Sequence, residues 1–204
     1  MELKQEYANL LRKYTAAITK TKTYIEILEK DYETRYNYCP IDHITSRLKT
    51  FDSTMEKMKR HKRNEDIKTI EEKITDIAGI RVVCHFEHDV DIIVKLIKED
   101  KSLKVIKEKD YIKDPKRNGY RSYHMVILQK VHLIDGDIFV PVEIQIRTLA
   151  QDFWAALEHQ IVYKYKGMVP AEIQEELKDC SDVADLLDKK MQVLSKKIQE
   201  QNEN

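Results

Sequence analysis

The sequence has few of the residues that interrupt secondary structure or that form disulfides. Among its 204 residues are only four glycines, four prolines and three cysteines. The scarcity of glycine and proline leaves no linker-like stretch, so we expect one compact domain with helical extensions. The cysteines are Cys39, Cys84 and Cys180. Their odd number and wide spacing exclude a disulfide framework and a cysteine-based metal motif.

The sequence also lacks a net charge and a long apolar run. Lys+Arg and Asp+Glu both number 36, so the formal net charge is zero. A general nucleic-acid binder normally carries a basic excess, and the balance argues against that class. No stretch is long and apolar enough to span a membrane, and the first residues lack the apolar block of a signal peptide. These features predict a cytoplasmic protein with no membrane partner.

Hydrophobic periodicity predicts helices at both ends of the chain and a sheet between them. Apolar residues at three- and four-residue spacing indicate a helix over residues 1–35, which ends before Pro40. The other helices are expected over residues 53–62, 89–99 and 149–166, with one or two more over 171–201. Strands are expected over residues 77–86, 104–109, 122–133 and 137–148, the last two joined by a turn. This order predicts an α+β (mixed α/β) fold with a central mixed sheet flanked by helices.

The domain organisation follows from the same pattern. We expect a single domain over residues 1–204. It comprises an N-terminal helical extension (1–38), a catalytic core (39–166) and C-terminal helices (170–204).

The strand VEIQIRT shows the clearest sign of a functional site. Side chains alternate across a strand, so Glu143, Gln145 and Arg147 share one face while the apolar residues share the other. Three polar groups in a row on an otherwise apolar sheet suggest a site. A solvated sheet face would give the same pattern, so this strand alone leaves both interpretations open.

The segment ITDIAGIRVV adds an acid and a buried cation. Asp76 comes just before the predicted strand, a position typical both of metal ligands in phosphoryl transfer and of turn residues. Arg81 lies inside the apolar run, where a charged side chain needs a partner.

Two further segments concentrate positive charge. The loop DPKRNGYRSYH carries the cationic or titratable residues Lys116, Arg117, Arg121 and His124. Such groups can hold phosphates, and Tyr120 can stack on a base, although the loop taken alone favours an ordinary Asn-Gly turn with solvated charges. The segment SRLKTFDSTMEKMKR would bring a second set together if the chain turns at residues 51–53: Arg47, Lys49, Lys57 and Arg60.

The segment AQDFWAALEH reads as the start of a helix. Phe153, Trp154 and Leu157 form an apolar stripe that we expect in the core. Asp152 lies in the first helical turn, where the helix dipole favours an acid, and it also follows the polar strand closely. The sequence leaves open whether Asp152 stabilises the start of the helix or belongs to the site.

In this order, the motifs DIAGIRVV, PKRNGYRSYH and VEIQIRTLAQDFWAALEH, preceded by SRLKT and EKMKR, resemble the synthetase domain of the RelA/SpoT family. The resemblance covers about residues 40–166. It implies a nucleotidyltransferase-like mixed sheet and a stand-alone small alarmone synthetase. Such an enzyme transfers pyrophosphate from ATP to the ribose 3′-hydroxyl of GDP or GTP and so makes (p)ppGpp.

The resemblance also implies a role for each matching residue. The acids matching Asp76 and Glu143 bind Mg²⁺, and the glutamate is the candidate base for the 3′-hydroxyl. The tyrosine matching Tyr120 stacks on guanine. The arginines matching Arg47 and Arg81 sandwich the adenine. The basic residues matching Lys49, Lys57 and Arg60 hold the ATP phosphates. The acceptor phosphates are approached by the residues matching Lys116 and His124, with Gln145 and Arg147 as phosphate-binding or supporting groups.

Recognition of guanine needs an acceptor of two hydrogen bonds, because the base presents N1–H and N2–H donors side by side. A carboxylate accepts both, and Asp152 lies just beyond the catalytic strand. We therefore hypothesise that Asp152 binds the guanine edge.

Two other functions stay open. Some small members of the family pyrophosphorylate the 3′ end of tRNA, which would need a basic track. Residues available for such a track are Lys20, Lys22, Arg60, His61, Lys62 and Arg63. A non-catalytic guanine-nucleotide-binding regulator is the second alternative, and the intact pair of acids argues against it. The resemblance further implies a homotetramer built by the apolar stripes of the terminal helices, in some members with single-stranded RNA as a regulator.

Overall fold

A single mixed sheet of five strands forms the centre of the protein. The computed structural model describes residues 2–165 and 169–202. The strand order is β1-β2-β5-β4-β3, in which only β2 and β5 run parallel. The strands are β1 (Ile41–Leu48), β2 (Ala78–Cys84), β3 (Lys104–Asp110), β4 (Tyr123–Leu133) and β5 (Gly136–Thr148). The mixed α+β architecture is the one that the sequence predicts.

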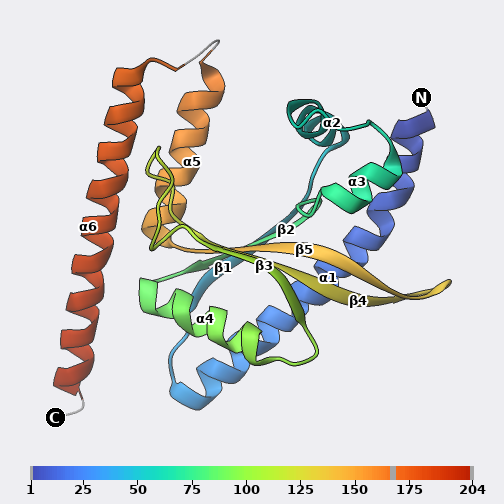
Figure 1. Cartoon of the computed structure of the whole chain (residues 1–204). Coiled ribbons are helices and arrows are strands. Elements are labelled where there is room, and N and C mark those ends of the chain that lie inside the picture. The colour runs from blue at the N-terminus through green and yellow to red at the C-terminus, as the bar shows by residue number, and fades with distance from the viewer. Residues whose placement is uncertain (1, 166–168, 203–204) are drawn as a thin grey trace.

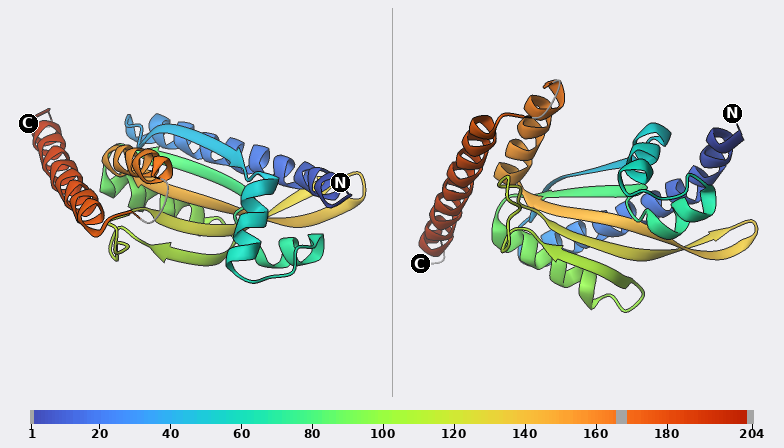
Figure 2. Two further views of the ribbon diagram at one scale, coloured as in Figure 1. Left: turned by 90° about the horizontal axis from the view of Figure 1, so that it is seen from above. Right: turned by 45° about the horizontal axis from the view of Figure 1, so that its top comes forward.

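Six helices flank this sheet within the described residues. They are α1 (Glu2–Tyr36), α2 (Phe51–Arg60), α3 (Ile67–Lys73), α4 (Glu87–Glu99), α5 (Leu149–Lys164) and α6 (Ala171–Asn202). Helices α1 and α4 run along the same face of the sheet, and α5 and α6 lie side by side at one end of it (Figure 1). Figure 2 shows α2 and α3 standing on the side away from α4. No helix of the described part of the chain combines the length and apolar character needed to cross a membrane.

The two faces of the sheet differ in chemistry. On β5, Val142, Ile144 and Ile146 are fully buried and face α1 and α4. The register aligns them with apolar residues of the neighbouring strands: Ala78, Ile80 and Val82 on β2, and Met125 and Ile127 on β4. The alternation expected for VEIQIRT is therefore confirmed. The opposite face, which we call the polar face, is free to carry a site.

Most predicted elements are confirmed, with shifts at their ends. Helix α2 begins at Phe51, two residues early, because the Thr50 side chain caps it by accepting from the backbone N–H of Ser53. Residues 51–53 are thus its first turn and not a separate bend. The turn between β4 and β5 lies at residues 134–135, and Gly136 takes a φ of 110°. The segment after Pro170 is one continuous helix, and residue 166 of the helix predicted over residues 149–166 lies outside the described residues.

One prediction about the core is wrong. Trp154 is buried, but Phe153 is 65% exposed and Leu157 is 47% exposed. They continue along α5 at four-residue spacing through Ile161 to Tyr165, the residue that caps the end of α5, and α6 exposes a similar stripe. The exposed residues of α6 are Val183, Leu186, Leu187, Met191, Val193, Leu194 and Ile198. We call these side chains the apolar surface of α5 and α6.

Candidate active site

The register of the sheet assembles the candidate site on the polar face. Glu143, Gln145 and Arg147 alternate along β5, and each is aligned with residues of both neighbouring strands. Residues that share this face by register are Thr45 and Arg47 on β1, Gly79 and Arg81 on β2, His124 and Val126 on β4, and Lys107 and Lys109 on β3. Five strands therefore contribute side chains to one surface.

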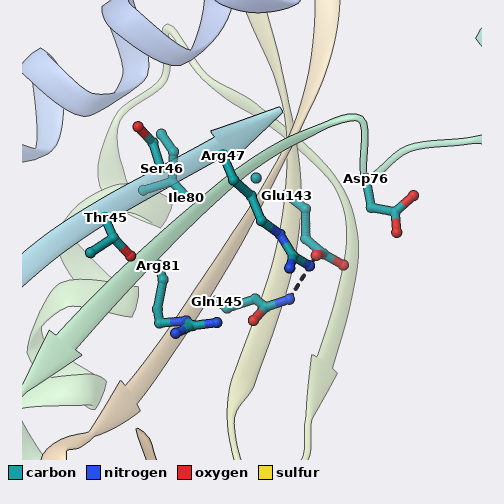
Figure 3. Close-up of a pocket in the computed structure, with 9 residues that line it drawn as sticks. Thr45, Ser46, Arg47, Asp76, Ile80, Arg81, Glu143 and Gln145 are labelled. Carbon is teal, nitrogen blue, oxygen red and sulfur yellow. Dashed lines mark hydrogen bonds between the residues drawn. The ribbon is translucent and has the colours of Figure 1, made fainter. Parts of the chain in front are cut away.

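The first pocket on this face contains two arginines, and we call it the arginine pocket. Its lining residues are Thr45, Ser46, Arg47, Asp76, Gly79, Ile80, Arg81, Glu143 and Gln145. Figure 3 shows the side chains of Arg47, Arg81 and Gln145 pointing toward one another in front of the sheet. The Arg47 side chain lies across β2 above Gly79, where a Cβ would come within 3.6 Å of its Cγ. This is an ordinary van der Waals distance, so the Arg47 side chain packs directly over β2 at this point.

Asp76 sits at the edge of the arginine pocket beside two lysines. Its Oδ2 lies 3.0 Å from Nζ of Lys49 and 2.8 Å from Nζ of Lys57. Burial raises the pKa of Asp76, but the hydrogen bonds and charges of the two lysines outweigh it, so the pKa falls below its ordinary value. The carboxylate is therefore ionised at neutral pH. The predicted convergence of Lys49 and Lys57 is confirmed.

The carboxylates of this pocket suit a hard divalent cation. Asp76 Oδ1 is buried and has no hydrogen-bond partner, so one oxygen remains available to a ligand. Among the described residues, no cluster of three or more histidine, cysteine or acidic side chains forms a complete metal cage. Mg²⁺ does not need one, because it is usually held by one or two carboxylates together with water and substrate phosphates. Asp76 and Glu143 match that donor set.

The second pocket on the polar face contains three lysines, and we call it the lysine pocket. Its lining residues are Lys107, Lys109, Tyr111, Lys116, His124, Met125, Val126 and Glu143. Lys116 Nζ lies 4.8 Å from the ring centroid of Tyr111 and 4.6 Å from that of Tyr120. The ammonium thus rests against two aromatic rings at one end of the pocket, a cation–π arrangement that a bound ring or phosphate could replace.

Tyr120 connects this pocket to β4 and β5. Its hydroxyl is 2.8 Å from Nε2 of His124, and the Arg147 guanidinium lies 5.6 Å from its ring centroid. Burial raises the pKa of Tyr120, which keeps the phenol neutral. A neutral ring fixed by these neighbours is a suitable platform for an aromatic base.

Glu143 lines both pockets. Gln145 Nε2 donates to its Oε2 at 2.8 Å, and His124 Nδ1 lies 3.7 Å from its Oε1. Burial raises the pKa of Glu143, but the contacts with His124 and Gln145 outweigh it and lower the pKa below its ordinary value. One ionised carboxylate is thus oriented between two cationic pockets.

Arg147 and Asp152 lie behind the pockets, where β5 runs into α5. Arg147 is only 3% exposed; it donates to Gln145 at 2.6 Å and lies 3.5 Å from Asp152. Asp152 also faces Arg81 at 3.2 Å. Arg81 thus has the partner that its apolar surroundings predict. Asp152 contacts a residue of the arginine pocket and is absent from the residues that line the lysine pocket.

The sequence-predicted residues do not all converge. Arg60 is exposed and lines neither pocket. Arg121, one of the loop cations that could have held phosphates or remained solvated, does neither and pairs with Asp182 and Asp185 of α6. Lys107, Lys109 and Tyr111 were not singled out from the sequence. The alternation of lysines in KEKD, read as a strand, is the signal that could have found the first two.

Comparison with known proteins identifies the family whose sequences and structures this chain resembles. Residues 46–168 match a family model described as a region found in RelA/SpoT proteins. The chain is 39% identical over 194 residues to GTP pyrophosphokinase YwaC of Bacillus subtilis, covering 95% of this chain and 92% of the relative. It is 35% identical over 196 residues to GTP pyrophosphokinase YjbM of the same organism, covering 96% and 92%. It superposes with a TM-score of 0.87 on small alarmone synthetase 1 of Bacillus subtilis bound to its product pppGpp, at 34% identity and covering 96% and 99% of the chains.

Proposed function

The chain belongs to the RelA/SpoT family, and on this premise we propose that its two pockets bind the donor and the acceptor of a pyrophosphate transfer. The protein is a GTP pyrophosphokinase: the donor is ATP, the acceptor is GDP or GTP, and the product is the alarmone (p)ppGpp. The observation that carries the assignment of the pockets is that Glu143 lines both of them. One carboxylate can therefore face both substrates.

The arginine pocket suits ATP. Arg47 and Arg81 present two guanidinium planes, which stack on a purine and add cation–π attraction. Lys49 and Lys57 bring two ammonium charges to the side of the pocket marked by Asp76, where the triphosphate would lie. Arg60 follows Lys57 by one helical turn on α2, but it is exposed outside the pocket, so in this proposal it would meet the triphosphate only at the rim of the site.

The lysine pocket suits a guanosine nucleotide with a 5′-polyphosphate. Tyr120 offers its ring to the guanine. Lys107, Lys109 and Lys116 line the pocket and, with His124, can neutralise two or three phosphate groups. We therefore expect GDP and GTP to be better acceptors than GMP.

The reaction makes one bond and breaks one. The ribose 3′-oxygen of the acceptor bonds to the β-phosphorus of ATP, the bond from that phosphorus to the oxygen of the α-phosphate breaks, and AMP leaves. Glu143 accepts the proton of the 3′-hydroxyl, while Gln145 and His124 hold its carboxylate in place. Mg²⁺ bound by Asp76 and Glu143 would neutralise charge on the transferred phosphates. Because a carboxylate with a low pKa is a weak base, alignment and charge neutralisation must supply much of the rate.

The direct test incubates the purified protein with γ-labelled ATP, Mg²⁺ and, in separate reactions, GMP, GDP, GTP or deacylated tRNA. Label on GDP and GTP is expected, with little on GMP. Label on tRNA alone would overturn the choice of acceptor and make the protein a translation toxin. Nucleotide binding without any product would instead leave a non-catalytic regulator.

Asp152 is expected to contribute to guanine recognition. The substitution Asp152→Ala should raise the KM for GDP by about tenfold, because it removes an acceptor for two base N–H groups. The KM for ATP should rise by a clearly smaller factor, since Arg81 loses the carboxylate that it faces at 3.2 Å but stays in the arginine pocket. Steady-state kinetics with each nucleotide varied in turn provide the measurement.

The matched control is Glu172→Ala, which removes an acid from the first turn of α6 instead of α5. Equal increases in the two KM values for Asp152→Ala would contradict the guanine assignment. Such a result would assign Asp152 to holding Arg81, which it faces at 3.2 Å.

Three further parts of the proposal concern the whole chain. The apolar surface of α5 and α6 supports a homotetramer, because a stripe of this kind is normally covered by another helix. Sedimentation should then give about four times the chain mass of 24.2 kDa.

The free thiols of Cys39, Cys84 and Cys180 support a reducing, cytoplasmic location. We also keep the division into an N-terminal extension (1–38), a catalytic core (39–166) and C-terminal helices (170–204).

A further inference from the structure

Helix α6 contacts the loop that carries Tyr120. This loop, residues 111–122, connects β3 to β4, and we call it the acceptor loop. We propose that α6 holds the acceptor loop in its binding conformation, and that Gly119 and Arg121 are positioning residues for the acceptor nucleotide. The proposal rests on the proposed function in assigning the lysine pocket to the acceptor.

The first contact between the two segments requires a glycine. Ser181 Oγ of α6 donates to the Gly119 carbonyl at 2.6 Å. Gly119 has a φ of 90°, which side-chain-bearing residues rarely adopt. A Cβ on Gly119 would also lie 2.7 Å from the Ser181 Cβ, well inside van der Waals contact. Backbone conformation and close approach therefore both depend on glycine at this position, which immediately precedes Tyr120.

The second contact is an arginine directed away from the pockets. The Arg121 side chain is only 14% exposed and lies 3.1 Å from Asp182 and 3.6 Å from Asp185. The same guanidinium donates to the Ile112 carbonyl at 3.4 Å, so it also connects the two ends of the acceptor loop. An arginine with several partners is suited to such cross-linking, because its donors are fixed in one plane. Arg121 therefore contributes to acceptor binding by ordering the loop and not by touching phosphate.

Helix α6 is itself anchored next to the catalytic strand. Trp154 Nε1 of α5 donates to the Leu177 carbonyl at 2.8 Å. Thr148, the last residue of β5, donates its hydroxyl to Asp188. One helix thus connects the end of the strand that carries Glu143 to the loop that carries Tyr120. Loss of the connection would leave the loop to be ordered by the acceptor itself, which weakens acceptor binding more than the chemical step.

The decisive comparison is between two glycine substitutions. Gly119→Ala should raise the KM for GDP by about tenfold and change the KM for ATP, and kcat at saturating GDP, by less than about twofold. Gly136→Ala is the matched control: Gly136 also has a positive φ, of 110°, but a Cβ there would meet nothing within 4 Å. Gly136→Ala should keep the wild-type kinetic constants.

A second pair of variants removes charge without backbone strain. Arg121→Ala should raise the KM for GDP by a similar factor, and Arg121→Lys should restore part of it, since an ammonium can still pair with one aspartate. Arg35→Ala is the control, because it removes an arginine that pairs with Asp31 on α1. Hydrogen–deuterium exchange without nucleotide should show faster exchange in residues 111–122 for Arg121→Ala and no change there for Arg35→Ala.

The outcomes separate this inference from the proposed function. An active wild-type enzyme whose acceptor KM is unchanged in Gly119→Ala and Arg121→Ala would overturn the role of α6. Equal increases in both KM values would overturn it as well. An inactive wild-type protein would overturn the proposed function, and the exchange measurement would still decide whether α6 orders the acceptor loop.

Discussion

Replacing Glu143 with glutamine is expected to lower kcat by about three orders of magnitude. The substitution keeps the size and shape of the side chain but removes both the proton acceptor and a negative charge beside the transferred phosphates. Gln145 and His124 now hold that carboxylate at 2.8 and 3.7 Å, so it is already oriented before substrates arrive. The measurement is the rate of labelled (p)ppGpp formation at saturating ATP and GDP.

The matched control is Glu108→Gln. Glu108 lies in the same sheet but lines neither pocket: it pairs with Lys98 at 2.9 Å and accepts a hydrogen bond from the Tyr123 hydroxyl at 3.1 Å. It should keep nearly full activity. If Glu143→Gln retained more than about a tenth of the wild-type kcat, Glu143 would not be the proton acceptor of the reaction.

Replacing Asp76 with asparagine is expected to lower activity by about two orders of magnitude and to raise the concentration of Mg²⁺ needed for half-maximal rate. An amide offers one neutral oxygen in place of two charged ones. It also leaves Lys49 and Lys57 side by side without the carboxylate that they share. The measurement is a magnesium titration of the initial rate.

Excess magnesium distinguishes the two acids. It should restore part of the rate in Asp76→Asn, because Glu143 and the ATP phosphates can still bind the cation, but not in Glu143→Gln, which lacks the proton acceptor. Asp137→Asn is the control, since Asp137 also pairs with a lysine, Lys130, but lies by the β4–β5 turn. An unchanged magnesium requirement in Asp76→Asn would show that Asp76 serves only to pair the lysines.

Local patterns in the sequence predict the centre of the site well. Alternation in VEIQIRT assigns Glu143, Gln145 and Arg147 to one face, and the parallel pairing of β2 with β5 brings Arg81 beside Gln145. The position of Asp76 directly before a predicted buried strand is what identifies it as a candidate site residue. These inferences succeed because each depends on the two-residue period of a strand or on its end.

Two elements have no comparable local signal. Strand β1 lies at the edge of the sheet, and most of its side chains are polar and exposed, so it lacks the alternation that marks a half-buried strand. Helix α3 has seven residues, of which Ile70 is buried. Both were missed for this reason, although β1 carries Arg47.

Long-range contacts are the other part that sequence patterns cannot supply. Arg121 reads as one more cation in a basic loop, and its partner Asp182 lies 61 residues further on. Exposure of Phe153 and Leu157 likewise depends on where α6 packs against α5. Neither fact follows from a period of two or of 3.6 residues.

Helix α6 has two sides with different surroundings. Its polar side holds the acceptor loop through Ser181 and Asp182, and its apolar side is exposed. Any partner that packs on the apolar side and orders α6 is thermodynamically linked to the nucleotide in the lysine pocket. The linkage is reciprocal: the factor by which the partner tightens GDP binding equals the factor by which GDP tightens binding of the partner. Formation of the assembly and saturation of the acceptor site would then be coupled, so that a change in one shifts the other.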